Sequence, residues 1–321
     1  MNRLTLIAVL VLTTIFTCTS CDKEELFKSL YIKGLTIDNY PKVDGSTSTA
    51  PLNAIIACKL LGIRYEWVST GAGVTQSVLP KLNYENSGKF WNPIKSSETH
   101  QSFINLIDKE SDLILNARRM SSDEKAYANA AGVSLIETPI ALDAFIFIVH
   151  PKNPINSLTI KQVQEIYTGK ITQWNEVGGS NYATITPYVR NANSGSQELM
   201  ETLVMKDLNI TEFPISSPEL ILGGMFSTVD AVANNVNSIC YTVYYYKEHI
   251  VTQNVAVKTI AVDGIFPDKE TISNKSYPYV AEVYAVIRSD LDNSSMAYKI
   301  YEFLQTKAGK EIISESGYLP N

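Results

Sequence analysis

The stretch TITPYVRNANSGSQELMETLVM, residues 184–205, decides the fold class of this 321-residue chain. It opens with a strand-like segment, passes through a turn of Asn, Ser and Gly, and continues as QELMETLVM, whose pattern predicts a helix. A strand that turns directly into a helix is the repeating unit of α/β proteins. We therefore expect an α/β fold around this stretch.

The alternation of strands and helices continues on both sides of that stretch. Expected strands cover residues 112–117, 132–142, 143–151, 238–246 and 281–289, and expected helices cover residues 50–60, 103–112, 158–167, 228–236, 296–305 and 310–317. Residues 71–98 have few periodic apolar positions, so we expect a loop-rich insertion there. This order predicts mainly parallel sheets, and the chain length predicts two lobes.

The overall charge excludes one large class of partner. The formal net charge is −6, and nucleic-acid backbones are usually held by an excess of Lys and Arg. We therefore expect no nucleic-acid partner. An anionic ligand would have to be held by a local group of donors.

The N-terminus has the pattern of a processing signal. Arg3 gives a positive start, residues 4–16 are apolar apart from threonines, and CTSC follows. The residues before Cys21 resemble the lipobox of bacterial lipoproteins, although Cys18 stands where Leu is usual. The resemblance implies that residues 1–21 are a signal peptide and that Cys21 is lipidated. Cleavage near Cys21 to give a secreted protein is the alternative.

The other cysteines and the histidines give little sign of a metal site. Cys58 and Cys240 stand in apolar surroundings, where a small buried hydrophobic residue and a disulfide partner are both open interpretations. The three histidines, His100, His150 and His249, are scattered, and no CxxC or HExxH motif occurs. We expect no metal and no cofactor.

Two hydroxyl-rich turns each lead into a helix. DGSTSTAPL at residues 44–52 has four consecutive hydroxyl side chains, and RNANSGSQEL at residues 190–199 repeats the same order of turn and helix. A helix start leaves backbone N–H groups without partners and carries the positive end of the helix dipole, so such turns can bind an anion. Plain N-capping is the alternative for either turn. Arg190 adds a fork-shaped donor suited to an oxyanion, or it is an ordinary ion-pair residue.

The segment LTIKQVQEIYTGKITQWNEVGG, residues 158–179, resembles the signature of the phosphate-binding solute receptors of ABC transporters, a periplasmic-binding-protein-like family. Further matches to this family are DGSTST, VRNANSGSQELM, NSICYTVYYY and AGKEIISESGYLP. These ordered matches span residues 42–321, nearly the whole chain after the signal peptide.

The resemblance implies a two-lobed periplasmic binding protein fold of type II, in which hinge strands join the lobes and both lobes close on a dehydrated oxyanion. It implies a tether at residues 22–41, lobe I at residues 42–142 and 275–321, and lobe II at residues 143–274. The expected function is capture of inorganic phosphate or a similar oxyanion for uptake. The expected partners are ABC permease subunits, and the expected state is a monomer held in the cell envelope by its lipid, facing the periplasm or the outer surface.

Two loops of the resemblance carry ligand-binding residues. The first and second loops of the family match these positions of the chain: Ser46, Thr47 and Ser48, then Arg190, Ser194, Gly195 and Ser196. In the third loop, SETH resembles a KTH turn of one subgroup, which implies that Thr99 binds the ligand and that His100 is a candidate donor. GAG at residues 71–73 is an alternative match to this loop.

One departure from the family affects specificity. Well-known members place an aspartate after the strand that corresponds to DLILNA, where it accepts a proton from phosphate and repels sulfate. Here that position is near Ala117 and is followed by Arg118 and Arg119. We expect Arg118 to reach the cleft and Arg119 to face solvent. Phosphate is the leading ligand, and its discrimination from sulfate or arsenate stays open.

Two other functions compete with a transport receptor. A surface or sensory protein could reuse the binding fold without feeding a transporter. A serine hydrolase with His100 as base is the third interpretation, which the absence of a GxSxG motif disfavours. We therefore expect a binding protein and not an enzyme.

Overall fold

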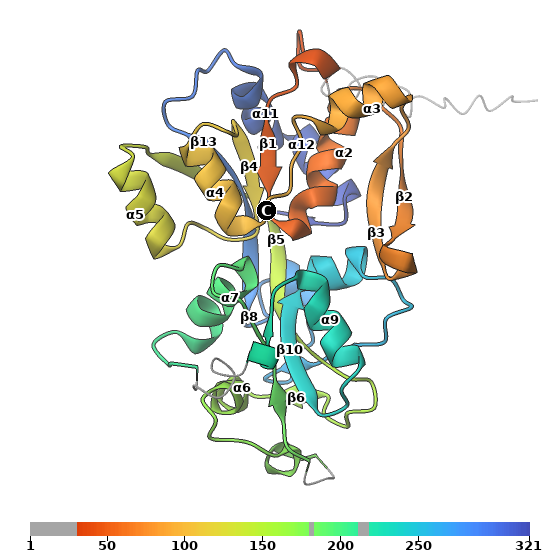
Figure 1. Cartoon of the computed structure of the whole chain (residues 1–321), viewed down its shortest axis with the longest axis vertical. Coiled ribbons are helices and arrows are strands. Elements are labelled where there is room, and N and C mark those ends of the chain that lie inside the picture. Colours follow the sequence, from red (N-terminus) through yellow and green to blue (C-terminus); the bar gives the residue numbers. More distant parts are fainter. Residues whose placement is uncertain (1–30, 180–182, 211–217) are drawn as a thin grey trace, which may run out of the picture.

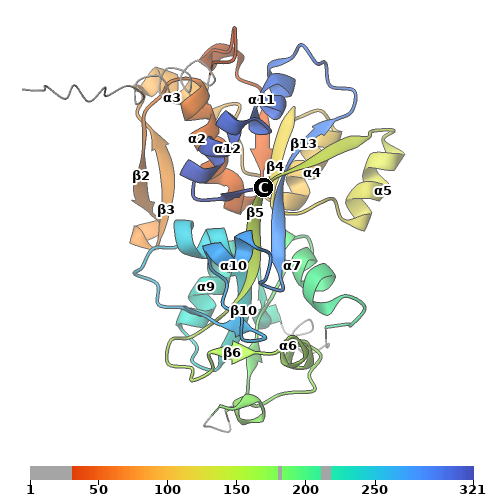
Figure 2. The same cartoon turned by 180° about the vertical axis from the view of Figure 1, so that it is seen from behind.

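The computed structural model describes residues 31–179, 183–210 and 218–321. Figure 1 and Figure 2 show two bodies stacked along the long axis and connected by two long strands, β5 (Leu135–Val149) and β13 (Val280–Arg288). We call the upper body in Figure 1 lobe I and the lower body lobe II. Residues 1–30, which include Cys21 and most of the expected tether, lie outside the described part of the chain.

A single mixed sheet connects the lobes. Its strand order is β1-β4-β13-β5-β10-β7, with β11 and β14 also paired to β5. Strand β5 is 15 residues long, about 50 Å when extended. Its first part pairs antiparallel with β13, and residues 145–149 pair antiparallel with β10. The parallel pairs, β1 with β4 and β10 with β7, lie at the two ends of the sheet. The expected strands 132–142 and 143–151 are therefore one strand that serves both lobes.

Lobe I is built around β1 and β4, with helices on both sides. Its elements are η1 (Ile37–Asn39), β1 (Val43–Gly45), η2 (Thr47–Thr49), α2 (Ala50–Leu60), β2 (Tyr65–Thr70), η3 (Gly71–Gly73), β3 (Thr75–Pro80), α3 (Tyr84–Trp91), α4 (Thr99–Ile107), β4 (Leu113–Asn116), α5 (Ser122–Ala130), α11 (Met296–Leu304), α12 (Lys307–Glu315) and β14 (Leu319–Pro320). Helix α2 is apolar on nearly every side because α12 and β3 cover it, and Leu52 and Ile55 are fully buried.

Lobe II is built around β10, and shorter elements surround it. Its elements are β6 (Ser157–Leu158), α6 (Ile160–Tyr167), η4 (Trp174–Val177), β7 (Thr186–Pro187), β8 (Val189–Arg190), α7 (Gly195–Leu199), η5 (Met200–Met205), η6 (Pro218–Leu220), β9 (Ile221–Leu222), α9 (Met225–Ala233), β10 (Ser238–Val243), η7 (Tyr246–Ile250), β11 (Lys258–Thr259), β12 (Ala261–Val262) and α10 (Lys269–Ser273). The apolar stripe expected on α6 is buried, with Val163, Ile166 and Tyr167 in the core.

The prediction of a loop-rich insertion at residues 71–98 was wrong. Strands β2 and β3 form an antiparallel hairpin through a tight turn at residues 71–73, and α3 follows. Most hairpin side chains are half-buried, so no clean alternation of apolar and polar residues marks the strands in the sequence. The hairpin tip points from lobe I toward lobe II (Figure 1).

Two expectations about chemistry can be compared directly with the fold. Cys58 and Cys240 are both free and buried, so the disulfide interpretation was wrong and the small-hydrophobe interpretation holds. Among the described residues no three His, Cys, Asp or Glu side chains are grouped to hold a metal ion.

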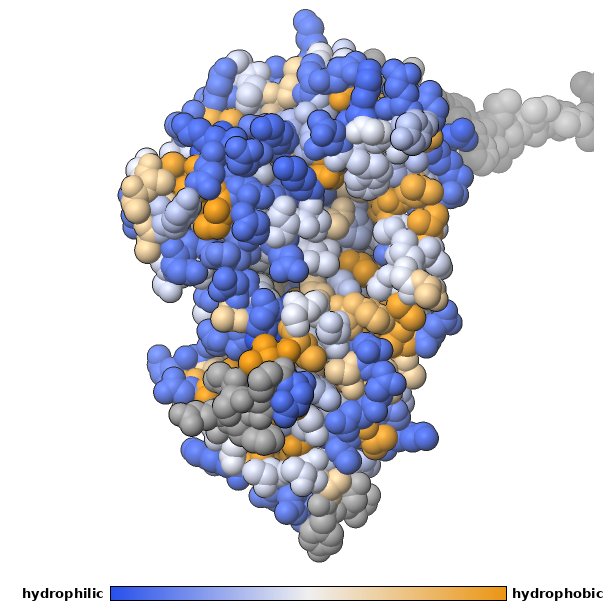
Figure 3. All heavy atoms as spheres, viewed as in Figure 1, coloured by the Kyte–Doolittle hydropathy of each residue, from blue (hydrophilic) through white to orange (hydrophobic). Residues whose placement is uncertain are grey.

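No described helix is both long and apolar enough to cross a bilayer. In the space-filling view the surface is mostly hydrophilic, with apolar residues gathered at the waist (Figure 3).

Candidate functional site

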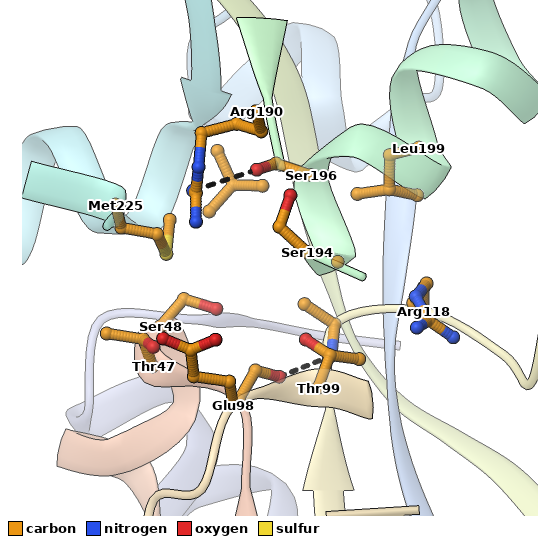
Figure 4. A pocket seen from close by; sticks show the side chains of 14 residues that line it. Thr47, Ser48, Glu98, Thr99, Arg118, Arg190, Ser194, Ser196, Leu199 and Met225 are labelled. Atoms are coloured by element: carbon orange, nitrogen blue, oxygen red, sulfur yellow. Dashed lines mark hydrogen bonds between the residues drawn. The ribbon is translucent and has the colours of Figure 1, made fainter. Parts of the chain in front are cut away.

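A small pocket at the waist lies where three helix starts converge. Helices α2 (through η2) and α4 come from lobe I, and α7 comes from lobe II (Figure 4). The residues that line this pocket are Ser46, Thr47, Ser48, Glu98, Thr99, Ala117, Arg118, Arg190, Ser194, Gly195, Ser196, Leu199, Met225 and Val243. The cavity volume is about 30 Å³, which suits a small ion and excludes a sugar or a peptide in this conformation.

The first loop is held in place by its own first hydroxyl. The backbone N–H of Ser46 donates to Leu115 O (3.1 Å), and Ser46 Oγ accepts from Ala117 N (3.0 Å) and donates to Asn116 Oδ1 (3.3 Å). The Ser46 hydroxyl therefore fastens the loop to β4 and its proton is already engaged. The hydroxyls of Thr47 and Ser48 hydrogen-bond to no described residue and lie at the pocket (Figure 4). Their N–H groups are those that a helix start leaves without internal partners.

The second loop orients a buried arginine. Arg190 is 5% exposed, and its guanidinium donates to Leu222 O (Nε, 2.9 Å), Gly223 O (Nη2, 3.0 Å) and Ser196 Oγ (Nη1, 3.1 Å). These three bonds fix the fork and leave two of its five N–H donors for a ligand. Burial lowers the pKa of the Arg190 guanidinium, and nearby groups, Glu98 among them, act in the opposite direction. The group remains a cation at neutral pH.

The serines of the second loop keep their protons available. Ser194 is the N-cap of α7, and its Oγ accepts from Gln197 N (3.1 Å). Ser196 Oγ accepts from Arg190. A hydroxyl that accepts a hydrogen bond still has an O–H to donate, so both serines can donate into the pocket.

The third loop meets the second across the pocket. Thr99 begins α4, and it faces Gly195 of lobe II so closely that a Cβ built on Gly195 would lie 3.0 Å from Thr99 Cβ. The lobes are therefore in contact around the pocket. GAG at residues 71–73 lies instead at the hairpin tip, where Gly73 O accepts from Thr252 Oγ1 (2.7 Å). The structure thus brings the Thr99 position to the pocket and leaves the alternative match outside it.

The structure does not bring His100 to the pocket. Its Nδ1 lies 3.0 Å from Glu124 Oε1, and its side chain is absent from the pocket lining. Arg118 reaches the edge of the pocket, but Nη1 and Nη2 both bond to the Glu124 carboxylate at 2.7 Å. Arg119 turns away, and its guanidinium lies 5.0 Å from the centre of the Tyr284 ring. Glu124 therefore offsets the positive charge of Arg118.

Sequence reasoning missed Glu98, which lies directly before Thr99. Its side chain lines the pocket beside Thr47 and Ser48 (Figure 4). The residue has φ 68° and ψ 167°, a conformation that is common only for Gly. A single glutamate in a polar loop carries no sequence pattern that could have singled it out.

Comparison with known proteins identifies the family. The model of the PBP superfamily domain matches residues 39–304. The chain belongs to the PBP superfamily. Among solved structures, this PBP-superfamily chain resembles a substrate-binding protein from Clostridium perfringens with bound phosphate (TM-score 0.63, 24% identity, covering 87% of this chain and 98% of that one). It also resembles an ABC-type phosphate transport receptor from Vibrio cholerae (TM-score 0.59, 19% identity, covering 87% of this chain and 98% of that one). These likenesses establish the two-lobed fold.

Curated relatives of this PBP-superfamily chain include phosphate-binding proteins. PstS of Borreliella burgdorferi is 25% identical over 185 residues, which is 57% of this chain and 65% of that protein. PstS of Staphylococcus epidermidis is 26% identical over 262 residues, 78% of this chain and 77% of that protein. The matched part is thus just under two thirds of the first relative's length.

The pocket of this PBP-superfamily protein is built to hold an ion and shows no catalytic pairing. Arg190 is its one cation without a carboxylate partner among the described residues. Apart from the Glu98 carboxylate and the paired Arg118, the other polar groups that line it are N–H and O–H donors. A serine nucleophile needs a base within hydrogen-bond reach. Neither Ser194 nor Ser196 bonds to a histidine in the described part of the chain, and His100 bonds to Glu124.

Proposed function

We propose that this chain is an extracytoplasmic receptor that captures inorganic phosphate between its two lobes and delivers it to an ABC transporter. The observation that carries the proposal is the convergence of three helix starts and the Arg190 fork on one small pocket between the lobes. Helix N-termini favour anions through their N–H groups and dipole. The relatives named PstS, phosphate-binding proteins, support phosphate as the anion.

Binding would replace the water around a phosphate by fixed donors from both lobes. Lobe I would offer the N–H and O–H groups of Thr47, Ser48 and Thr99, and lobe II would offer Arg190 and the second loop. The residues we propose around the ligand are Ser46, Thr47, Ser48, Thr99, Arg118, Arg190, Ser194, Gly195 and Ser196. Ser46 and Arg118 would act mainly by holding the loops, since their polar groups are already bonded. His100 would act through Glu124.

The remaining parts of the proposal concern location and partners. Lipidation at Cys21 would hold the protein at the membrane surface through the tether at residues 22–41. The receptor would act as a monomer, with lobe I at residues 42–142 and 275–321 and lobe II at residues 143–274. Release would require the two lobes to separate in front of permease subunits, because ligand contacts come from both lobes.

The test is isothermal titration calorimetry of the protein with phosphate, sulfate and tungstate. We expect phosphate to bind with 1:1 stoichiometry, and Arg190→Ala to weaken binding about thirtyfold or more, because removing a buried charged donor costs ~2 kcal/mol or more. Arg64→Ala, which removes an exposed arginine, should leave affinity unchanged. Absence of heat and of a thermal shift with all three anions would refute the receptor.

A further inference from the structure

A carboxylate without a cationic partner lies buried behind the pocket. Asp44 is the middle residue of β1, and its side chain is fully buried. Gly45 N (2.8 Å) and Ser97 N (2.8 Å) donate to Oδ1, and Asn105 Nδ2 (2.7 Å) donates to Oδ2. Among the described residues no lysine or arginine forms an ion pair with this carboxylate. Burying a charge with only neutral donors is costly, so its presence here calls for a reason.

The Asp44 side chain continues a pairing that the backbone ends. The chain before the third loop runs parallel to β1: Val43 N donates to Pro93 O (2.7 Å), and Lys95 N donates to Val43 O (2.8 Å). Beyond this point the backbone pairing stops, and Ser97 N donates to the Asp44 carboxylate instead. The third loop is therefore fastened to the strand that leads into the first loop.

The same carboxylate also holds the helix that follows the third loop. Asn105 lies in α4, which begins at Thr99, so Oδ2 holds the helix while Oδ1 holds the chain just before it. Between these two attachments Glu98 has φ 68° and ψ 167°, a region that residues other than Gly adopt only when their surroundings impose it. Asp44 holds the chain on both sides of Glu98 and so helps to impose this conformation.

The three donors explain why the residue is an aspartate. Asparagine has one acceptor oxygen, which could serve Gly45 N and Ser97 N, but its NH₂ group would then face another donor, Asn105 Nδ2. Turning the Asn105 amide around would break the bond that its Oδ1 accepts from Gln101 Nε2 (2.9 Å). Two acceptor oxygens are therefore needed at position 44, and the charge accompanies them.

The two loops that Asp44 joins form the lobe I side of the pocket. Thr47 and Ser48 come from the first loop and Thr99 comes from the third (Figure 4). Asp44 itself does not line the pocket. A donor must lie about 2.7–3.2 Å from a ligand oxygen, so a shift of about 1 Å in one loop removes its donors from the ligand. The relative position of the two loops therefore decides whether both can bind one anion.

We propose that Asp44 is a positioning residue of the pocket: its two oxygens fix the third loop against the first, so that Thr47, Ser48 and Thr99 converge on one anion. Asp44 acts through these loops and touches no ligand. This inference rests on the proposed function, since it assumes that the pocket holds an anion.

Calorimetry with phosphate on Asp44→Asn and on the reciprocal double variant Asp44→Asn/Asn105→Asp tests it. The single variant places two donors face to face, so we expect phosphate affinity to fall about tenfold or more. The double variant restores an acceptor opposite a donor and moves the charge to α4, so its affinity should return to within about threefold of wild type. Asp207→Asn, the same change at an exposed position, should leave affinity unchanged.

A double-mutant cycle separates positioning from a purely structural role. Thr99→Ala removes a proposed ligand donor of the third loop. Where Asp44→Asn has already displaced this loop, Thr99→Ala should cost several times less affinity than it does in wild type, whereas Ser194→Ala in lobe II should cost the same in both backgrounds. A purely structural Asp44 would change the melting temperature and leave both costs unchanged.

The variants keep a second link between the two loops. Asn116 Oδ1 accepts from Ser46 Oγ (3.3 Å) in the first loop and from Ser102 Oγ (3.0 Å) in α4, so we expect Asp44→Asn to fold. Asn105→Ala is milder, because it removes only the bond to Oδ2, and it should lower phosphate affinity about threefold. Where Asp44→Asn yields no folded protein, wild-type affinity in Asn105→Ala refutes the proposal.

The outcomes are distinct. Wild-type protein that binds no oxyanion refutes the proposed function and this inference with it. Wild-type affinity in Asp44→Asn refutes the inference alone. Tighter binding by Asp44→Asn also refutes it, because the charge would then act on the ligand through space. A double variant that binds as weakly as the single one refutes it as well, and in these last three cases the receptor function stands.

Discussion

Glu124 explains why two expected ligand residues are placed as they are. Its carboxylate is fully buried and accepts from both terminal nitrogens of Arg118, from Ser121 N (2.9 Å) and from the ring of His100. A buried carboxylate needs such partners to offset its lost hydration. The sequence indicates Arg118 and His100 as polar residues near the pocket, but nothing in it pairs them with a glutamate on the next helix.

Removing this carboxylate should destabilise the fold. Glu124→Gln leaves Arg118 buried with no charged partner, so we expect the free energy of unfolding to fall by about 3–5 kcal/mol. Urea denaturation followed by circular dichroism measures this. Glu110→Gln, at an exposed position, is the control. A loss of less than ~1 kcal/mol would mean that Arg118 finds another partner.

Asp143 makes stability depend on pH. It lies in β5 between the lobes, 2% exposed, and burial raises its pKa to about 7. Its Oδ1 accepts from Tyr245 N and Ala144 N, while Oδ2 has no partner in the described part of the chain. An acid whose pKa is raised on folding binds its proton more tightly in the native state. The stabilising contribution of the Asp143 carboxyl group is therefore fully present below about pH 4. It falls as the pH rises to about 7 and stays low at higher pH.

Asp143→Asn should remove this dependence. Asn keeps the acceptor for Tyr245 and Ala144 and mimics the protonated acid. We expect the free energy of unfolding of the variant, relative to that of wild type, to rise by about 2.5 kcal/mol between pH 5 and pH 8, because the pKa of Asp143 is raised from 3.8 to about 7 and part of the effect is already present at pH 5. Urea denaturation at both pH values gives the difference, with the exposed Asp207→Asn as control. A difference between variant and wild type that is the same at pH 5 and pH 8 would contradict the assignment.

At the scale of elements, the start of α7 sets how closely the lobes approach. Gly195 is the first residue of this helix, and a side chain there would collide with Thr99 of lobe I. The helix itself would accept alanine, which is a better helix former than glycine. Gly195 is therefore required by the contact between the lobes and not by its own backbone.

Gly195→Ala should impair closure without impairing folding. We expect an unchanged or higher melting temperature without ligand and a phosphate affinity at least tenfold lower. Small-angle X-ray scattering should show no decrease of the radius of gyration on adding phosphate. Gly88→Ala, in α3 with open space around the position, should keep full affinity. Wild-type affinity in Gly195→Ala would mean that Thr99 can move aside.

The elements differ in how well the sequence reveals them. Helix α6 has a regular apolar stripe, and β5 contains a short apolar run at residues 144–149, so both could be predicted, although the sequence predicts β5 as two strands. The β2–β3 hairpin could not, because its half-buried side chains give no clear period. In the site, the two hydroxyl-rich turns and Arg190 could be predicted from the residue types and their order along the chain. Glu98 could not be found, since its position at the pocket depends on one backbone conformation.

At the scale of the whole molecule, the hairpin forms a third connection between the lobes besides β5 and β13. Its tip contacts residues 249–254, which are the end of η7 and the segment after it. Thr252 donates through N to Val74 O (3.0 Å) and through Oγ1 to Gly73 O (2.7 Å), and Gln76 Nε2 donates to His249 O (2.8 Å). Because these bonds exist while the lobes are in contact, they favour the closed arrangement.

Loosening the hairpin tip should therefore shorten the lifetime of the complex. The double variant Gln76→Ala/Thr252→Val removes two side-chain hydrogen bonds, each worth about 1 kcal/mol. We expect the phosphate dissociation rate, measured by stopped-flow competition, to rise about three- to thirtyfold while the association rate changes little. Thr70→Val removes a hydrogen bond to Thr75 within the hairpin and none to lobe II, so its rate should match wild type. A dissociation rate that is unchanged in the double variant would show that β5 and β13 alone control opening, with the hairpin following passively.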